Sequence, residues 1–174
     1  MSPADIIKDA VGSILDRDLR ALGREVEAYQ DEADLWRAVP GISNSAGTLA
    51  LHLAGNLQHF IGACLGGSGY VRDRAAEFSR RNVDRAELLR EVEAARAAVK
   101  AALSKLAPSQ LLADFPEPIA ETRIRTGDYL IHLATHFAYH LGQVDYHRRV
   151  VTGSDTTVGA MRPTELSSAR AAAR

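Results

Sequence analysis

The sequence predicts an all-α protein that folds as a single four-helix bundle. Four long segments carry apolar residues at intervals of three and four positions, which is the spacing of one buried helix face. No alternation of apolar and polar residues typical of strands lies between them, so a bundle is favoured over an α/β fold. The chain has 174 residues, of which 46% are hydrophobic, and one domain of this length can bury a core without disulfides.

The first two helices are separated by a clear break in the apolar pattern. The first helix is expected from about Pro3 to Tyr29. Pro40 and Gly41 interrupt the pattern, and the cluster Ser43–Ser45 offers N-cap residues for a second helix that extends to about Leu65. The apolar face of the first helix comprises Ile7, Val11, Ile14, Leu15, Leu19, Leu22 and Val26.

A glycine-rich and charged stretch, from Gly66 to Asn82, shows no sustained apolar period and is expected to be a loop. Fully extended, it would span roughly 50 Å, whereas a 22-residue helix is roughly 33 Å long. The loop could therefore cross the length of a bundle, which permits an up-down-down-up topology. A third helix is then expected from the N-cap candidate Asp84, with Pro108 just beyond its end.

The segment from Leu111 to Thr126 contains two prolines and several β-branched residues, which disfavour a helix and permit a short hairpin. The last helix is expected to begin at Thr126 or Gly127, to run to about Thr152, and to end at Gly153. We therefore expect one domain over residues 1–153. Residues 154–174 show little periodicity and are expected to form a frayed C-terminal tail.

Composition argues against several classes of partner. Lysine and arginine number 21 against 22 acidic residues, so no net positive field favours nucleic acid. No apolar stretch reaches the roughly 20 residues of a membrane span. The first residues have neither the basic start nor the apolar run of a signal peptide, and Cys64 is the only cysteine. We therefore expect a cytoplasmic protein that contacts neither nucleic acid nor membrane.

Histidines gather on one face of two of the expected helices. On the second helix they lie at His52 and His59, with Asn56 between them, and each borders an apolar stripe. On the last helix the same face comprises Tyr129, His132, His136, His140, Gln143 and His147. A single buried histidine is usually a hydrogen-bonded core residue, but this number of clustered imidazoles indicates a metal site.

Imidazoles four residues apart on one helix, such as His136 and His140, can direct nitrogens at a common point. A third imidazole from a facing helix completes the set of three protein ligands typical of catalytic zinc sites. If the two helices are antiparallel and His52 faces His136 and His140, then His59 lies near His132. The alternative set of His59, His132 and His136 is also stereochemically allowed, and the spacing does not choose between the two.

Two stretches of the sequence resemble a known bacterial superfamily. The residues His136-Phe137-Ala138-Tyr139-His140-Leu141-Gly142-Gln143 and Leu51-His52-Leu53-Ala54 are similar to motifs of the DinB-like proteins, which include the YfiT-like proteins and thiol-dependent S-transferases. The likeness covers about Asp5 to Thr152. It implies an up-down-down-up bundle, often a homodimer, with one divalent nickel, zinc or iron ion held by His52, His136 and His140. His59, His132 and His147 are additional to this pattern.

These observations lead to a functional hypothesis. We expect a metal-dependent transferase that binds a low-molecular-weight thiol as thiolate on the open position of the ion. His59 and His132 are the candidate catalytic acid and base, whereas Asn56, Tyr139 and Gln143 are candidates for substrate binding. The rival hypothesis is a dimer that binds a metal or another small ligand without catalysis.

Two other chemistries receive less support. A hydrolase of the zincin type needs a glutamate base beside its ligands, and none lies between His136 and His140. Cys64 is expected to be a small core residue and not a nucleophile.

Overall fold

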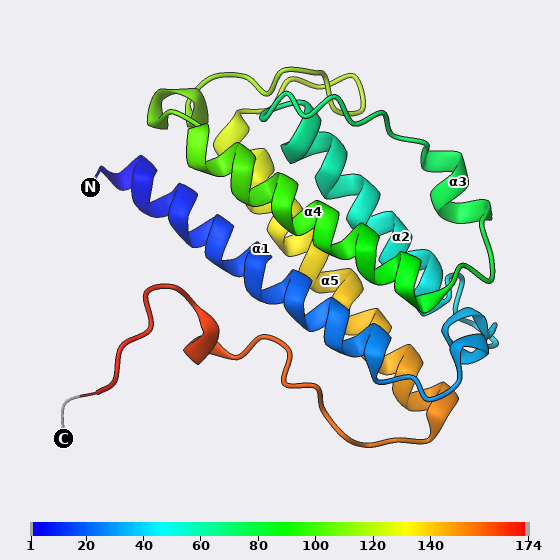
Figure 1. Cartoon of the computed structure of the whole chain (residues 1–174). Coiled ribbons are helices and arrows are strands. Elements are labelled where there is room, and N and C mark those ends of the chain that lie inside the picture. The colour runs from blue at the N-terminus through cyan, green and yellow to red at the C-terminus, as the bar shows by residue number, and fades with distance from the viewer. Residues whose placement is uncertain (1, 173–174) are drawn as a thin grey trace.

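The computed structural model describes residues 2–172, and its helices pack as a bundle (Figure 1). All-α architecture is confirmed, and the described residues contain no strand. The helices are α1 (Pro3–Glu27), α2 (Ala46–Leu57), α3 (Arg74–Ser79), α4 (Arg85–Lys105) and α5 (Thr126–Thr152). None of the described helices is long and apolar enough to cross a membrane.

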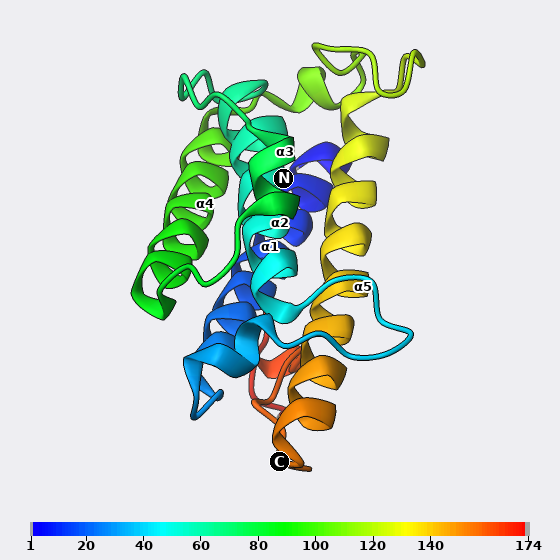
Figure 2. The ribbon, with the colours of Figure 1, turned by 90° about the vertical axis from the view of Figure 1, so that its right-hand side faces the viewer.

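The four long helices have the up-down-down-up order that the length of the first long loop permits. In Figure 1 the chain runs downward along α1 and upward along α2. It runs upward again along α4, parallel to α2, and then downward along α5, parallel to α1. Around the bundle, α1 contacts α4 and α5, and α2 contacts the same two helices. One face of the molecule is therefore made by α1 and α4, and the opposite face by α2 and α5 (Figure 2).

The helix ends follow local signals in the sequence. Ser45 caps α2 by accepting a hydrogen bond from the backbone N–H of Thr48, as its type predicts. Gly153 ends α5 in the left-handed conformation, with φ of 68°, which glycine adopts without strain. The apolar stripes between these ends meet in one continuous core, so the periodicity of the sequence positioned the long helices correctly.

The crossing segment between α2 and α4 was expected to be a loop, and this expectation is wrong for its second half. Residues Arg74–Ser79 form α3, which packs on α2. Its N-terminus is capped by Asp73, whose Oδ1 accepts a 2.8 Å hydrogen bond from the backbone of Ala76. Six residues are less than two helical turns, which is too short for a periodic pattern to be visible in the sequence.

A second difference lies at the end of α2. The expected uninterrupted helix changes at Gln58 into a π-helical segment that continues to Ala63. The backbone N–H of Cys64 donates a 2.9 Å hydrogen bond to the carbonyl of His59, five residues earlier. Segments of this kind are rare and often lie at functional sites.

The proline-containing segment before α5 does form a tight antiparallel turn. The backbones of Ile119 and Thr122 exchange two 2.9 Å hydrogen bonds around Ala120 and Glu121, which have φ of 47° and 63°. Only isolated bridges result, and no strand, so the expected hairpin is present in its shortest form.

The C-terminal segment, for which low periodicity predicts fraying, runs back along α1 (Figure 1). The backbone of Ser167 donates a 2.7 Å hydrogen bond to the hydroxyl of Ser13, and Glu165 pairs with Arg20 at 2.9 Å. Polar contacts therefore hold the C-terminal segment against α1. Such contacts produce no periodic pattern in the sequence, so periodicity could not indicate them. The expected domain boundary at residue 153 stays a prediction.

A buried ion pair links α1 and α5 near their C-terminal ends. The guanidinium of Arg148 on α5 is 1% exposed and donates a 2.5 Å hydrogen bond to the Glu25 carboxylate on α1, which is fully buried. The same guanidinium donates to the backbone carbonyl of Thr156 at 2.8 Å. Arg148 thus joins α5 to α1 and to the C-terminal segment. From the sequence, its position near the end of a helix indicates only a favourable interaction with the helix dipole.

Replacing Arg148 with alanine should strongly destabilise the fold, because the Glu25 carboxylate would remain buried without its partner. Removing one member of a buried ion pair costs about 3–5 kcal/mol of unfolding free energy. The matched control is Arg149→Ala, which removes a partly exposed arginine paired with Asp145 and should cost less than about 1 kcal/mol. Urea denaturation measures both values. Equal effects of the two substitutions would contradict this account of Arg148.

Candidate metal centre

Three of the predicted histidines meet on the α2–α5 face. His52 comes from α2, and His136 and His140 lie one turn apart on α5. Each ring offers one nitrogen as a possible ligand, and these three nitrogens all lie within 4.8 Å of one another. The Nε2 atoms of His52 and His136 are 3.5 Å apart. Antiparallel packing of α2 against α5 creates this arrangement, because it sets a single imidazole opposite a pair spaced by four residues.

The orientation of His52 is fixed by two residues of the crossing segment. Its Nδ1 lies 3.0 Å from Oε2 of Glu77, the buried glutamate of α3. Arg72 donates two hydrogen bonds to the same carboxylate, at 2.7 and 2.8 Å. A carboxylate can only accept, so Nδ1 of His52 carries the hydrogen, and the lone pair of Nε2 faces the other two histidines.

A glycine allows this carboxylate to approach α2 so closely. A Cβ atom at Gly55 would lie 2.3 Å from Oε1 of Glu77, which is far inside van der Waals contact. Burial by itself would raise the pKa of Glu77, but the hydrogen bonds from Arg72 and His52 outweigh it and lower the pKa. The group is therefore an anion at neutral pH, as the proposed tautomer of His52 requires.

Gln143 has an equivalent role at His140. Its Oε1 lies 2.7 Å from Nδ1 of His140, which leaves Nε2 of that ring available for other contacts. Gln143 was expected to bind substrate, and in the structure its carbonyl oxygen serves to orient a histidine. Tyr139, also expected to bind substrate, is 67% exposed, and its ring centroid lies 5.2 Å from that of His140.

Two of the three histidines in this cluster are held in the form that binds metals. Burial, followed by the neighbouring imidazoles of His140 and His52, lowers the pKa of His136 to about 4. Burial also lowers the pKa of His140, although the hydrogen bond to Gln143 opposes this effect. Both rings are therefore neutral near pH 7, and their lone pairs are free to donate to a cation.

The geometry of the cluster fits a first-row transition metal. An ion bound tetrahedrally at about 2.1 Å from three nitrogens would hold them about 3.4 Å apart. The 3.5 Å separation of His52 and His136 matches this value, and the 4.8 Å limit on the other pairs leaves only small side-chain movements. Three imidazole nitrogens suit zinc, nickel and iron alike.

The other predicted residues occupy different positions. His132 is exposed, and its ring centroid lies 6.0 Å from that of His136. Asn56 is buried, and its Oδ1 has no hydrogen-bond partner among the described residues. His59 pairs with Glu117 at 3.0 Å, a partner in the loop before α5 that the register argument did not anticipate.

Two further side chains have no place in the three-histidine cluster. His147 is buried between the hydroxyl of Tyr29 and the backbone carbonyl of Arg37, at 2.8 and 2.9 Å, and so supports the core. Burial raises the pKa of the Cys64 thiol to about 11, with a further contribution from Glu117. The free thiol is therefore protonated at neutral pH, which agrees with the expectation that Cys64 is not a nucleophile.

The sequence contained no usable signal for Glu77 and Arg72. Both lie in the segment expected to be a loop, in a run where charged residues are common. Only the path of the crossing segment over α2 brings them to His52 (Figure 2). A histidine that binds a metal almost always donates its other ring N–H to a carboxylate, a backbone carbonyl or water, so the existence of such an acceptor, though not its identity, could have been expected.

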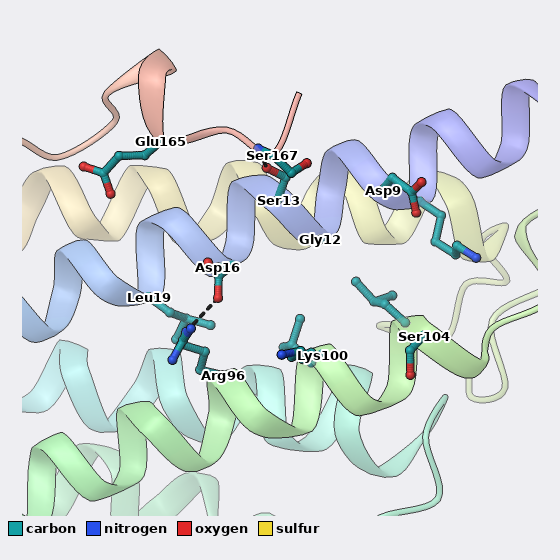
Figure 3. Close-up of a pocket in the computed structure, with 13 residues that line it drawn as sticks. Asp9, Gly12, Ser13, Asp16, Leu19, Arg96, Lys100, Ser104, Glu165 and Ser167 are labelled. Carbon is teal, nitrogen blue, oxygen red and sulfur yellow. Dashed lines mark hydrogen bonds and ion pairs between the residues drawn. The ribbon is translucent and has the colours of Figure 1, made fainter. Parts of the chain in front are cut away.

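A large cavity of about 730 Å³ lies elsewhere, on the α1–α4 face under the C-terminal segment (Figure 3). No histidine lines it. Its charged groups largely neutralise one another, as Figure 3 shows for Arg96 and Asp16, which are 2.6 Å apart. The cavity therefore offers no chemistry that competes with the histidine cluster on the opposite face.

Comparison with known proteins agrees with this choice of site. A family model described as mycothiol-S-transferase matches residues 10–153, which include most of α1, the other three long helices and all three clustered histidines. No curated protein and no solved structure matches the chain significantly. The family match covers most of the chain and agrees with the DinB-like resemblance of its motifs. The chain belongs to the mycothiol S-transferase family.

Proposed function

We propose that this protein is a metal-dependent transferase that joins a low-molecular-weight thiol of the mycothiol class to an electrophilic small molecule. The observation that carries the proposal is the convergence of His52, His136 and His140, with two of the rings oriented by Glu77 and Gln143. These three residues would hold one divalent ion of zinc, nickel or iron. The family match supports a thiol as the substrate class.

The chemistry follows from the donor set. A divalent ion held by His52, His136 and His140 would favour the thiolate form of a thiol bound beside it. Glu77 maintains the tautomer of His52, so the lone pair on its Nε2 already faces the other two histidines. The thiol proton would pass to solvent, and the sulfur would then be available as the nucleophile without a protein carboxylate as base.

Residues around the cluster have distinct proposed roles. His132 is close to His136 and accessible to solvent, so it is the better placed of the two candidate histidines to exchange a proton with a bound substrate. Oδ1 of Asn56, one turn after His52, has no partner among the described residues and would accept a hydrogen bond from a substrate amide or hydroxyl. Tyr139 offers an exposed ring at the edge of the cluster. A homodimer and a cytoplasmic location remain predictions.

The first test concerns the ligands. His52→Ala, His136→Ala and His140→Ala should each lower the metal content by about one equivalent per chain, because two imidazoles hold such an ion far more weakly than three. Elemental analysis after dialysis measures the content. His132→Ala is the matched control, since it removes an exposed histidine from the same helix face and should leave the content unchanged. Full metal content in the three ligand variants would rule out this site.

The second test concerns the carboxylate that orients His52. Glu77→Gln should weaken metal binding about 10–100-fold, the usual effect of losing such a partner, while the helices remain folded. Competition with a chromogenic chelator gives the affinity, and circular dichroism checks the fold. Glu87→Gln, which removes a carboxylate paired with Arg80 near the surface, should bind as tightly as the unaltered protein. If Glu77→Gln also bound with unchanged affinity, Glu77 would have no role at the metal.

The third test concerns the thiol. Cobalt-loaded Cys64→Ser protein contains no cysteine, so a sulfur-to-cobalt charge-transfer band that appears on adding mycothiol must come from the added thiol. The band should be absent when His140→Ala is introduced into the same background. The transferase proposal fails if no thiol alters the spectrum and the rate of thiol transfer to model electrophiles stays at background. The protein would then be interpreted as a non-catalytic metal-binding protein.

A further inference from the structure

A second group of metal-ligand side chains lies away from the three histidines. His59, Cys64 and Glu117 each offer one ligand atom, and the three atoms lie within 4.8 Å of one another. The imidazole Nε2 of His59 is 3.0 Å from Oε1 of Glu117 and 3.8 Å from Sγ of Cys64. All three side chains are partly buried. His59 follows His52 by seven residues, or about 10 Å along a helix, which is too far for both to bind the same ion.

The π-helical segment brings two of these residues together. In an α-helix, residues five positions apart point in directions about 140° apart, so His59 and Cys64 would not share a face. In the structure, the backbone N–H of Cys64 donates to the carbonyl of His59, which closes a wider turn and aligns the two side chains. The local departure from α-helical geometry thus creates the pair.

The third residue is held by a restrained segment of backbone. Glu117 lies between Pro116 and Pro118, and a proline on either side limits the conformations available to it. The loop is anchored beside the same end of α2 by Phe115, whose ring lies 6.2 Å from Phe60 and 4.7 Å from Tyr129. Both ribbon views place this loop and the end of α2 at one end of the bundle (Figures 1 and 2).

We propose that His59, Cys64 and Glu117 form a second metal site, suited to zinc, that links the loop before α5 to the end of α2. Thiolate, imidazole and carboxylate are the three ligand types that zinc accepts in proteins, at about 2.0–2.3 Å. Such an ion would separate the three ligand atoms by about 3.3–3.6 Å, close to the distances found for His59. The site is independent of the proposed transferase reaction.

Binding at this site includes one proton transfer. The S–H bond of Cys64 breaks as the sulfur–zinc bond forms, and the proton passes to solvent, so no oxidant or reductant is needed. His59 and Glu117 bind without a change of covalent structure. The combination of one sulfur with nitrogen and oxygen ligands distinguishes this site from the three-histidine cluster, which contains no sulfur.

Cobalt alone is the probe, used in buffer free of thiols. In His52→Ala protein, where the three-histidine cluster is incomplete, adding Co²⁺ should produce a sulfur-to-cobalt charge-transfer band that saturates near one equivalent per chain. Cys64 is the only cysteine in the sequence, so no other thiolate can give this band. Added Zn²⁺ should displace the cobalt and abolish it. The unaltered protein should show the same band, which keeps the test valid if His52→Ala folds poorly.

Matched variants decide which residues bind. The band should disappear in Cys64→Ser and weaken at least tenfold in apparent affinity in His59→Ala and Glu117→Gln, whereas Glu121→Gln, in the same loop, should leave it unchanged. Circular dichroism establishes that each variant is folded. The absence of any band at saturating cobalt in the unaltered protein would overturn the proposal, as would a band that survives in Cys64→Ser. An unchanged affinity in Glu117→Gln would overturn the three-residue site.

Discussion

The parallel packing of α2 and α4 is the constraint on which the rest of the structure depends. Because neighbouring helices that run in the same direction cannot be joined by a short turn, the chain must return along the bundle before α4 begins. The returning segment passes over α2 and brings Glu77 and Arg72 against His52. The connection required by the topology thus also supplies the groups that orient one ligand of the candidate metal centre.

Much of the fold could be predicted because it depends on helical periodicity. Four apolar stripes, separated by prolines, glycines and candidate N-cap residues, were sufficient to position the long helices and to show that His52, His136 and His140 border the core. Spacing alone did not select this set over the one containing His59 and His132. The choice between the two sets depends on how far α2 is shifted along α5. The motif resemblance indicated this shift, and the packing of α2 on α5 determines it.

The features that could not be predicted depend either on contacts between residues distant in sequence or on segments too short to show a pattern. Glu77 lies 25 residues from His52, and the partner of Arg148 is 123 residues away, so no local pattern indicates either pair. The change from α- to π-helix at Gln58 is equally hidden, because one extra residue per turn barely alters an apolar pattern only six residues long. No local pattern in the sequence indicates Glu117 as the partner of His59 either, because 58 residues separate the two.

The absence of a side chain at Gly55 limits how this centre could be transferred to another scaffold. Placing three histidines at the same spacing on a designed antiparallel helix pair would reproduce the ligands but not their support, since any larger residue at the position of Gly55 would exclude the carboxylate. Positions 55 and 77 should consequently vary together during evolution, with a side chain at the first tolerated only where the glutamate at the second has been lost.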